Sequence, residues 1–130
     1  MASLTELHNQ LIDYLDQGKF AEGIEDFYHD DVTAQENSNE PSRGREALAA
    51  NEKSFLKKVT AYHGTTVHAT AVDDRGDGNG VVFYEATMSW DQSDRPDTVN
   101  VHQTVVERWR DGKIASIRFY GNFDPGEVSE

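Results

Sequence analysis

The first half of the chain repeats hydrophobic residues with the period of a helix. Ser3 and Glu6 have the spacing of a capping box, and the leucines that follow share one helical face: Leu4, Leu7, Leu11 and Leu15. Gly18 is suited to end this helix in the left-handed conformation. A second, short helix is predicted from the apolar stripe Phe20, Ile24, Phe27 and Tyr28, and a third over residues 45–59.

The second half alternates apolar and polar residues and has no helical period. The alternation predicts strands over residues 31–36, 62–72, 81–90, 98–109 and 114–123, separated by loops and by turns rich in glycine. Helices followed by sequential antiparallel strands predict an α+β fold with the helices on one face of the sheet. No internal repeat or linker is visible. We therefore expect one domain over residues 1–124 and a frayed tail over residues 125–130.

The last hairpin predicts which residues face inward. Arg110, Asp111 and Gly112 suit a three-residue loop, which pairs Trp109 with Lys113. The more apolar face, taken as the inner one, then holds Val101, Gln103, Val105, Glu107, Trp109, Ile117 and Phe119. A two-residue turn would place Arg118 and Tyr120 inside instead.

Aromatic residues and a few polar groups share this inner face, which is typical of a small-molecule site. Glu36 lies on the same side of its strand as Val32 and Ala34. We predict that a small, largely apolar organic ligand contacts Tyr14, Asn37, Tyr84, Met88, Trp90, Gln103, Glu107, Trp109 and Phe119. Asn51 and Glu52 interrupt the apolar stripe of the third helix, which is more typical of the edge of a solvated face than of a pocket rim.

Composition and charge exclude several classes of function. The chain carries 12 basic and 24 acidic residues, a net charge of -12, so neither nucleic acid nor an anionic membrane is an expected partner. It has no cysteine, which excludes disulfides, thiolate metal sites and cysteine nucleophiles. Neither a signal peptide nor a membrane-spanning run is visible, so we expect a cytoplasmic protein. His29, Asp30 and Asp31 are adjacent and diverge, so no metal or cofactor site is predicted.

Several motifs together resemble a known superfamily. Residues 27–33, Glu36-Asn37, Glu40-Pro41 and residues 43–48 resemble the first half of nuclear transport factor 2-like domains, and residues 105–114 with Phe119-Tyr120 are similar to the closing hairpin of its SnoaL-like branch. This resemblance covers nearly the whole chain. It implies a cone-shaped roll in which a curved antiparallel sheet has the N-terminal helices packed across its concave face. The fold hosts isomerases, cyclases, hydrolases, dehydratases and non-catalytic proteins, so it does not by itself imply one activity.

Within this superfamily, the ketosteroid isomerases share the first-half pattern, and their catalytic aspartate corresponds to Glu36. Their oxyanion-stabilising residues correspond to Leu11 and Val105, which cannot take that role. The resemblance therefore implies cofactor-independent proton transfer, of isomerase or cyclase type, with Glu36 as the general base. Three alternatives stay open: Glu36 as a structural cap, a non-catalytic ligand-binding or sensing homodimeric domain, and a purely structural dimeric subunit.

The outer sheet face predicts assembly. Val106, Tyr120, His102 and Thr104 make this face more apolar than solvation alone requires, and such patches mark partner surfaces. Related domains pair through this sheet, so we predict a homodimer with two-fold symmetry. Light scattering should therefore give about twice the chain mass of 14.6 kDa. A particle of 14.6 kDa at micromolar concentration would contradict the prediction.

Overall fold

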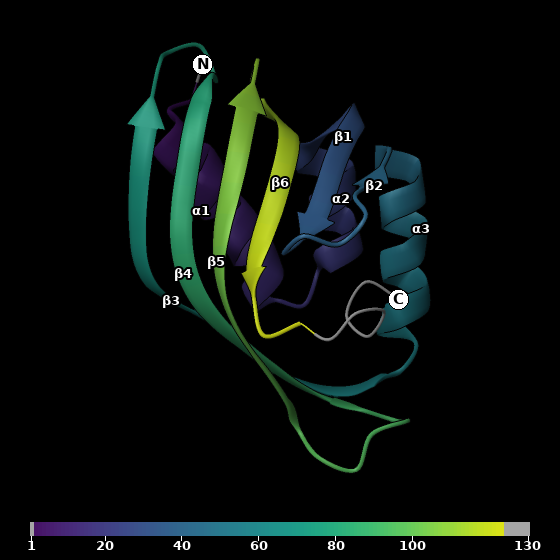
Figure 1. The fold of residues 1–130 in the computed structure, drawn as a ribbon. Coiled ribbons are helices and arrows are strands. Elements are labelled where there is room, and N and C mark those ends of the chain that lie inside the picture. Colours follow the sequence, from purple (N-terminus) through teal and green to yellow (C-terminus); the bar gives the residue numbers. More distant parts are fainter. Residues whose placement is uncertain (1, 124–130) are drawn as a thin grey trace.

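The computed structural model describes residues 2–123 and confirms the α+β architecture (Figure 1). Three helices and six strands follow in the order α1 (Leu4–Asp16), α2 (Phe20–Phe27), β1 (Tyr28–Glu36), β2 (Ser42–Arg43), α3 (Arg45–Leu56), β3 (Val59–Asp74), β4 (Gly80–Gln92), β5 (Val99–Arg110) and β6 (Lys113–Gly121). The predicted tail at residues 125–130 lies outside the described residues. No helix within residues 2–123 is long and apolar enough to cross a membrane.

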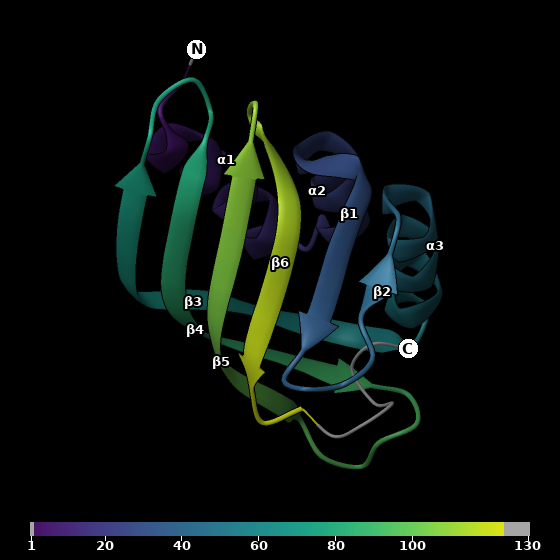
Figure 2. The same cartoon turned by 45° about the horizontal axis from the view of Figure 1, so that its top comes forward.

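The strands form one curved, unclosed sheet in the order β2-β1-β6-β5-β4-β3, with the helices on its concave side (Figures 1 and 2). β3 to β6 form the expected antiparallel meander. The sheet is mixed, however, because β1 runs parallel to β6. After β1 the chain forms the edge strand β2, leaves the sheet through α3 and returns at the opposite edge as β3. The last strand of the meander therefore arrives beside β1 in the same direction.

The closing hairpin differs from the sequence prediction in its turn. Asp111 and Gly112, with φ of 52° and 81°, form a two-residue turn, and Arg110 pairs with Lys113. Both central residues have positive φ, as the turns that match the twist of two strands require. The predicted three-residue loop, with Trp109 opposite Lys113, is therefore wrong.

A bulge nevertheless restores the predicted inner face. Trp109 pairs with Ile114 whereas Arg108 pairs with Ser116, so Ala115 is an extra residue in β6. A slip of one residue exchanges the faces of a strand, and the turn and the bulge each contribute one such slip. Ile117 is consequently buried, and Tyr120 stays outside with 43% of its surface exposed.

A buried hydrogen bond between His8 and Glu107 joins α1 to the sheet. His8 Nδ1 lies 2.8 Å from Glu107 Oε1, and Trp109 Nε1 donates to the same oxygen at 3.1 Å. His8 and Glu107 are 1% and 0% exposed. Sequence reasoning placed Glu107 in the pocket and overlooked His8, because it did not establish that α1 covers the Glu107 end of β5.

We predict that breaking this pair destabilises the fold strongly. The substitution His8→Leu leaves the Glu107 carboxylate buried without its partner, which should lower the free energy of unfolding by about 3–5 kcal/mol. The double variant His8→Leu/Glu107→Leu should recover much of that loss, because it removes the uncompensated charge. Urea unfolding of the three proteins measures both effects. Equal stability of the single and double variants would show that the pair is not energetically coupled.

The outer face of the sheet exposes two large hydrophobic side chains, Phe83 and Tyr120. His102 and Thr104 are exposed there as well, while Val106 is half-buried. The pairing of two copies through this face stays a prediction.

Candidate active site

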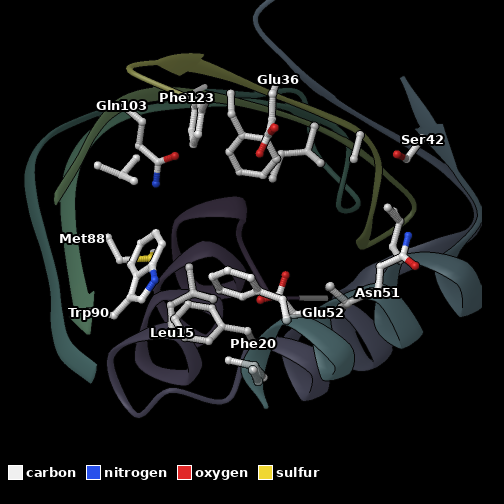
Figure 3. Close-up of a pocket in the computed structure, with 18 of the residues that line it drawn as sticks. Leu15, Phe20, Glu36, Ser42, Asn51, Glu52, Met88, Trp90, Gln103 and Phe123 are labelled. Carbon is white, nitrogen blue, oxygen red and sulfur yellow. The ribbon is translucent and has the colours of Figure 1, made fainter. Parts of the chain in front are cut away.

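A cavity of about 530 Å³ lies between the concave face of the sheet and the helices (Figure 3). Leucine, isoleucine, valine and aromatic side chains from the helices and the strands make up most of its wall. The aromatic residues are Phe20, Tyr28, Phe55, Tyr62, Tyr84, Trp90, Phe119 and Phe123. The volume is that of a site for a small organic molecule.

The cavity exists because the sheet bends away from the helices. β3 has three register shifts against β4, at Val59/Ala61, Tyr62/Gly64 and Val67/Ala69. Such bulges increase the local twist and curve the sheet. The curved ends of β3 and β4 thereby reach α3, where the rings of Phe55 and Trp90 meet edge to face at 5.6 Å. This contact closes one end of the cavity.

Six of the ten residues predicted for the site line this cavity: Glu36, Tyr84, Met88, Trp90, Gln103 and Phe119. They come from four different strands, so the curved sheet brings together residues far apart in sequence. In Figure 3, Gln103 and Glu36 extend into the cavity from the sheet, and Met88 and Trp90 form one side wall. Whether they contact a ligand stays a prediction.

The other four predicted residues are not in the cavity wall. Tyr14 donates its hydroxyl to Asp26 Oδ2 at 2.7 Å, between α1 and α2. Asn37 ties the end of β1 to β6, because its Nδ2 donates to Gly121 O at 2.9 Å and its Oδ1 accepts from Gly121 N at 3.0 Å. Glu107 and Trp109 lie in the core below α1, as described above. Alternation correctly predicted that Glu107 and Trp109 face inward. It does not determine how much of a strand the helices cover, and here the helices cover both residues.

Glu36 reaches the cavity from the last position of β1, opposite Phe119 of β6. Glu52 reaches it from α3, and Figure 3 shows the two carboxyl groups turned toward one another from opposite walls. The interpretation of Glu52 as the edge of a solvated face is therefore wrong. Leu48, Glu52 and Phe55 are spaced by four and three residues, which places the glutamate in the middle of the apolar stripe. That spacing was the signal that sequence reasoning missed.

The two carboxyl groups influence each other's charge. Burial, and to a lesser extent the nearby negative charge of Glu36, together raise the pKa of Glu52 from its ordinary value of 4.5 to about 7. Glu52 is therefore protonated in about half of the molecules near pH 7. The cavity thus brings a carboxyl group that can carry a proton near neutral pH together with a second carboxyl group, Glu36.

Two tyrosines in the wall keep their protons. Burial raises the pKa of both Tyr28 and Tyr84, and the charge of Glu107 behind them adds to the effect. Their hydroxyl groups thus stay neutral hydrogen-bond donors at all ordinary pH values.

Comparison with known proteins agrees with this fold. The model of the SnoaL-like domain matches residues 9–117. The chain belongs to the SnoaL-like family. This match confirms the resemblance to the SnoaL-like branch of the nuclear transport factor 2-like superfamily. None of the curated proteins matches this SnoaL-like chain significantly.

Solved structures share the fold at low sequence identity. A protein of Mesorhizobium loti described as a SnoaL-like polyketide cyclase is 22% identical, with a TM-score of 0.74 over 92% of this chain and 99% of its own. An epoxide hydrolase of M. tuberculosis is 18% identical, with a TM-score of 0.71 over 90% of this chain and 80% of its own. A protein of Bacillus subtilis described as an isomerase is 18% identical, with a TM-score of 0.69 over 91% and 85%. At these identities the likeness shows the fold alone.

We predict that Glu52 makes stability depend on pH. A carboxyl group whose pKa is raised by folding favours the folded state below its unfolded pKa, and this contribution is lost as the pH rises through about 7. Glu52→Gln removes the charge, so it should stabilise the protein by roughly 1–3 kcal/mol at pH 8 and by much less at pH 4.5. Thermal or urea unfolding at both pH values measures the difference. Equal effects at the two pH values would contradict the raised pKa.

Proposed function

We propose that this SnoaL-like protein is a cofactor-independent acid–base catalyst that transfers a proton on a small, largely apolar carbonyl compound. Glu36 is the general base and Glu52 the general acid. The observation that carries the proposal is that these two carboxyl groups face one another across an apolar cavity. The proposal gives this pairing of carboxyl groups a chemical role.

The proposed reaction uses one ionised carboxyl group, Glu36, and one protonated carboxyl group, Glu52. Ionised Glu36 abstracts a proton from the carbon next to the carbonyl group, and the electron pair of the broken C–H bond moves onto the carbonyl oxygen. Protonated Glu52 donates a hydrogen bond or its proton to that oxygen, which stabilises the developing enolate. Glu36 then returns its proton to the same or to another carbon of the enolate, Glu52 takes back any proton that it gave to the oxygen, and the carbonyl group re-forms, so no external oxidant or cofactor is required.

Glu52 would supply what the sequence comparison with ketosteroid isomerases leaves missing. The oxyanion positions of those enzymes carry Leu11 and Val105 in this chain. A carboxylic acid that stays neutral near pH 7 can serve as an oxyanion donor from a different element. The descriptions of the similar structures as a cyclase and an isomerase support reactions of this class, while the epoxide hydrolase shows that the fold accepts other chemistry.

Proton exchange tests the proposal without knowledge of the true substrate. A panel of small cyclic and aryl ketones is incubated with the protein in D2O, and deuterium incorporation next to the carbonyl is followed by NMR. We expect exchange that Glu36→Gln slows by roughly 10²–10⁴-fold. The affinity for the ketone, measured from the fluorescence of Trp90 in the cavity wall, should change little. Glu85→Gln, an equal charge change on the outer face, is the matched control.

Three outcomes of this experiment differ in meaning. Exchange that Glu36→Gln leaves unchanged overturns the role of Glu36. Ketone binding without any exchange would favour the non-catalytic ligand-binding domain instead. A variant that loses thermal stability but keeps its exchange rate would identify Glu36 as a structural cap.

The pH dependence of exchange should be bell-shaped. On the acid side the rate should rise as Glu36 ionises. On the alkaline side it should fall as the pH rises through about 7, because Glu52 then loses the proton that it must donate. Glu52→Gln should lower the rate and abolish the alkaline fall, since an amide does not titrate. Rates that keep rising above pH 8 in the unmodified protein would contradict the role of Glu52.

A further inference from the structure

The charges in the cavity wall have one sign. Among the described residues that line the cavity, three are glutamates, Glu36, Glu40 and Glu52, and none is lysine, arginine or histidine. A ligand with a carboxylate or phosphate group would therefore face like charge in a poorly solvated space. A ligand with a positive charge would face carboxylates only, with little solvent screening.

The aromatic wall is an independent reason to expect a cation. Aromatic faces attract ammonium groups, most strongly when the groups are alkylated and desolvated. The rings here are fixed by contacts with one another: Phe20 packs on Tyr62 at 5.2 Å and Phe55 on Trp90 at 5.6 Å, both edge to face. Aromatic side chains beside carboxylates match an apolar compound that bears an amine.

We propose that the cavity binds small apolar amines in their cationic form, with the ammonium group beside Glu36 and Glu52. This inference goes beyond the proposed function, because it names a second class of ligand for the same cavity and requires no turnover. Protonated alkyl and arylalkyl amines and quaternary ammonium compounds belong to this class. Carboxylic acids and phosphate esters of the same size do not.

Binding of such a cation should release a proton. In the empty cavity, the proton on Glu52 limits the negative charge of the pair. An ammonium group in contact with the pair favours the ionised form of Glu52, so the cation replaces the proton. Amines should therefore also inhibit the proposed reaction, because they remove the proton that Glu52 would donate.

The other charged groups around Glu52 do not prevent a bound cation from replacing its proton. From β1, Glu36 and Tyr28 interact with it electrostatically. On the neighbouring elements, Glu25 of α2 pairs with Lys53 of α3, Arg45 pairs with Asp30, and Arg43 of β2 is exposed. None of these cations lines the cavity.

Three probes of similar shape and different charge test the proposal. They are benzyltrimethylammonium, its neutral isostere neopentylbenzene, and the anion phenylacetate, with binding followed by calorimetry and tryptophan fluorescence. A quaternary ammonium ion cannot lose a proton, so any pH dependence of its binding comes from the protein. We expect the cation to bind at least about 10-fold more tightly than the neutral isostere at pH 8, and the anion most weakly.

Affinity for the cation should also rise between pH 6 and pH 8, with proton release that calorimetry in two buffers of different ionisation enthalpy detects. Glu52→Gln should weaken binding of the cation and remove its pH dependence, and leave the neutral isostere unaffected. Glu85→Gln, with the same charge change on the outer face, should alter neither.

Equal or tighter binding of neopentylbenzene overturns the proposal, and so does a cation affinity that is flat between pH 6 and pH 8. Absence of binding by all three probes at millimolar concentration overturns it as well. The comparison of probes on the unmodified protein is decisive even if a variant fails to fold. Failure of the proposed catalysis appears separately, as ketone binding without deuterium exchange.

Discussion

The curvature of the sheet is the constraint on which the rest of the structure depends. A flat sheet would pack its whole inner face against the helices and leave no cavity. The register shifts in β3 bend the strands so that α1 and α2 cover one part of the concave face, and α3 meets the far ends of β3 and β4. The space left between them is the 530 Å³ cavity. Among the residues that face inward, those on the curved part of the sheet therefore line the cavity, and alternation alone does not identify them.

The same curvature gives two inward-pointing acidic residues, Glu107 of β5 and Glu52 of α3, different surroundings. Glu107 lies under α1 and is compensated by His8 and the indole of Trp109, so its charge serves the cohesion of the core. Glu52 forms no ion pair with any described residue and faces Glu36 across the cavity. Burial beside a like charge raises its pKa, which is costly for stability and useful for proton transfer. A carboxyl group is thus structural or reactive according to whether its environment compensates its charge.

Charge also connects the two proposals. In the two proposals Glu52, whose pKa is about 7, gives its proton to a carbonyl oxygen or exchanges it for an ammonium group. Both uses depend on the absence of a basic side chain from the described part of the wall, since a lysine or arginine there would keep both carboxyl groups ionised.

The sequence by itself determined the three helices, the five longer strands and the α+β fold class, because hydrophobic period, caps and turn residues are local signals. Its motifs also resembled the family that the comparison confirmed. The sequence also predicted that Glu36, Gln103 and Trp90 face inward, since alternation is a property of a single strand. Only the tertiary structure decided the rest. The two-residue turn and the bulge at Ala115 each shift the register of β6 by one residue and so cancel, which no local pattern reveals. β1 lies parallel to β6 through a contact between distant segments. Glu52 became part of the site, and Glu107 did not, because the curvature of the sheet and the placement of the helices select which inward residues meet the cavity.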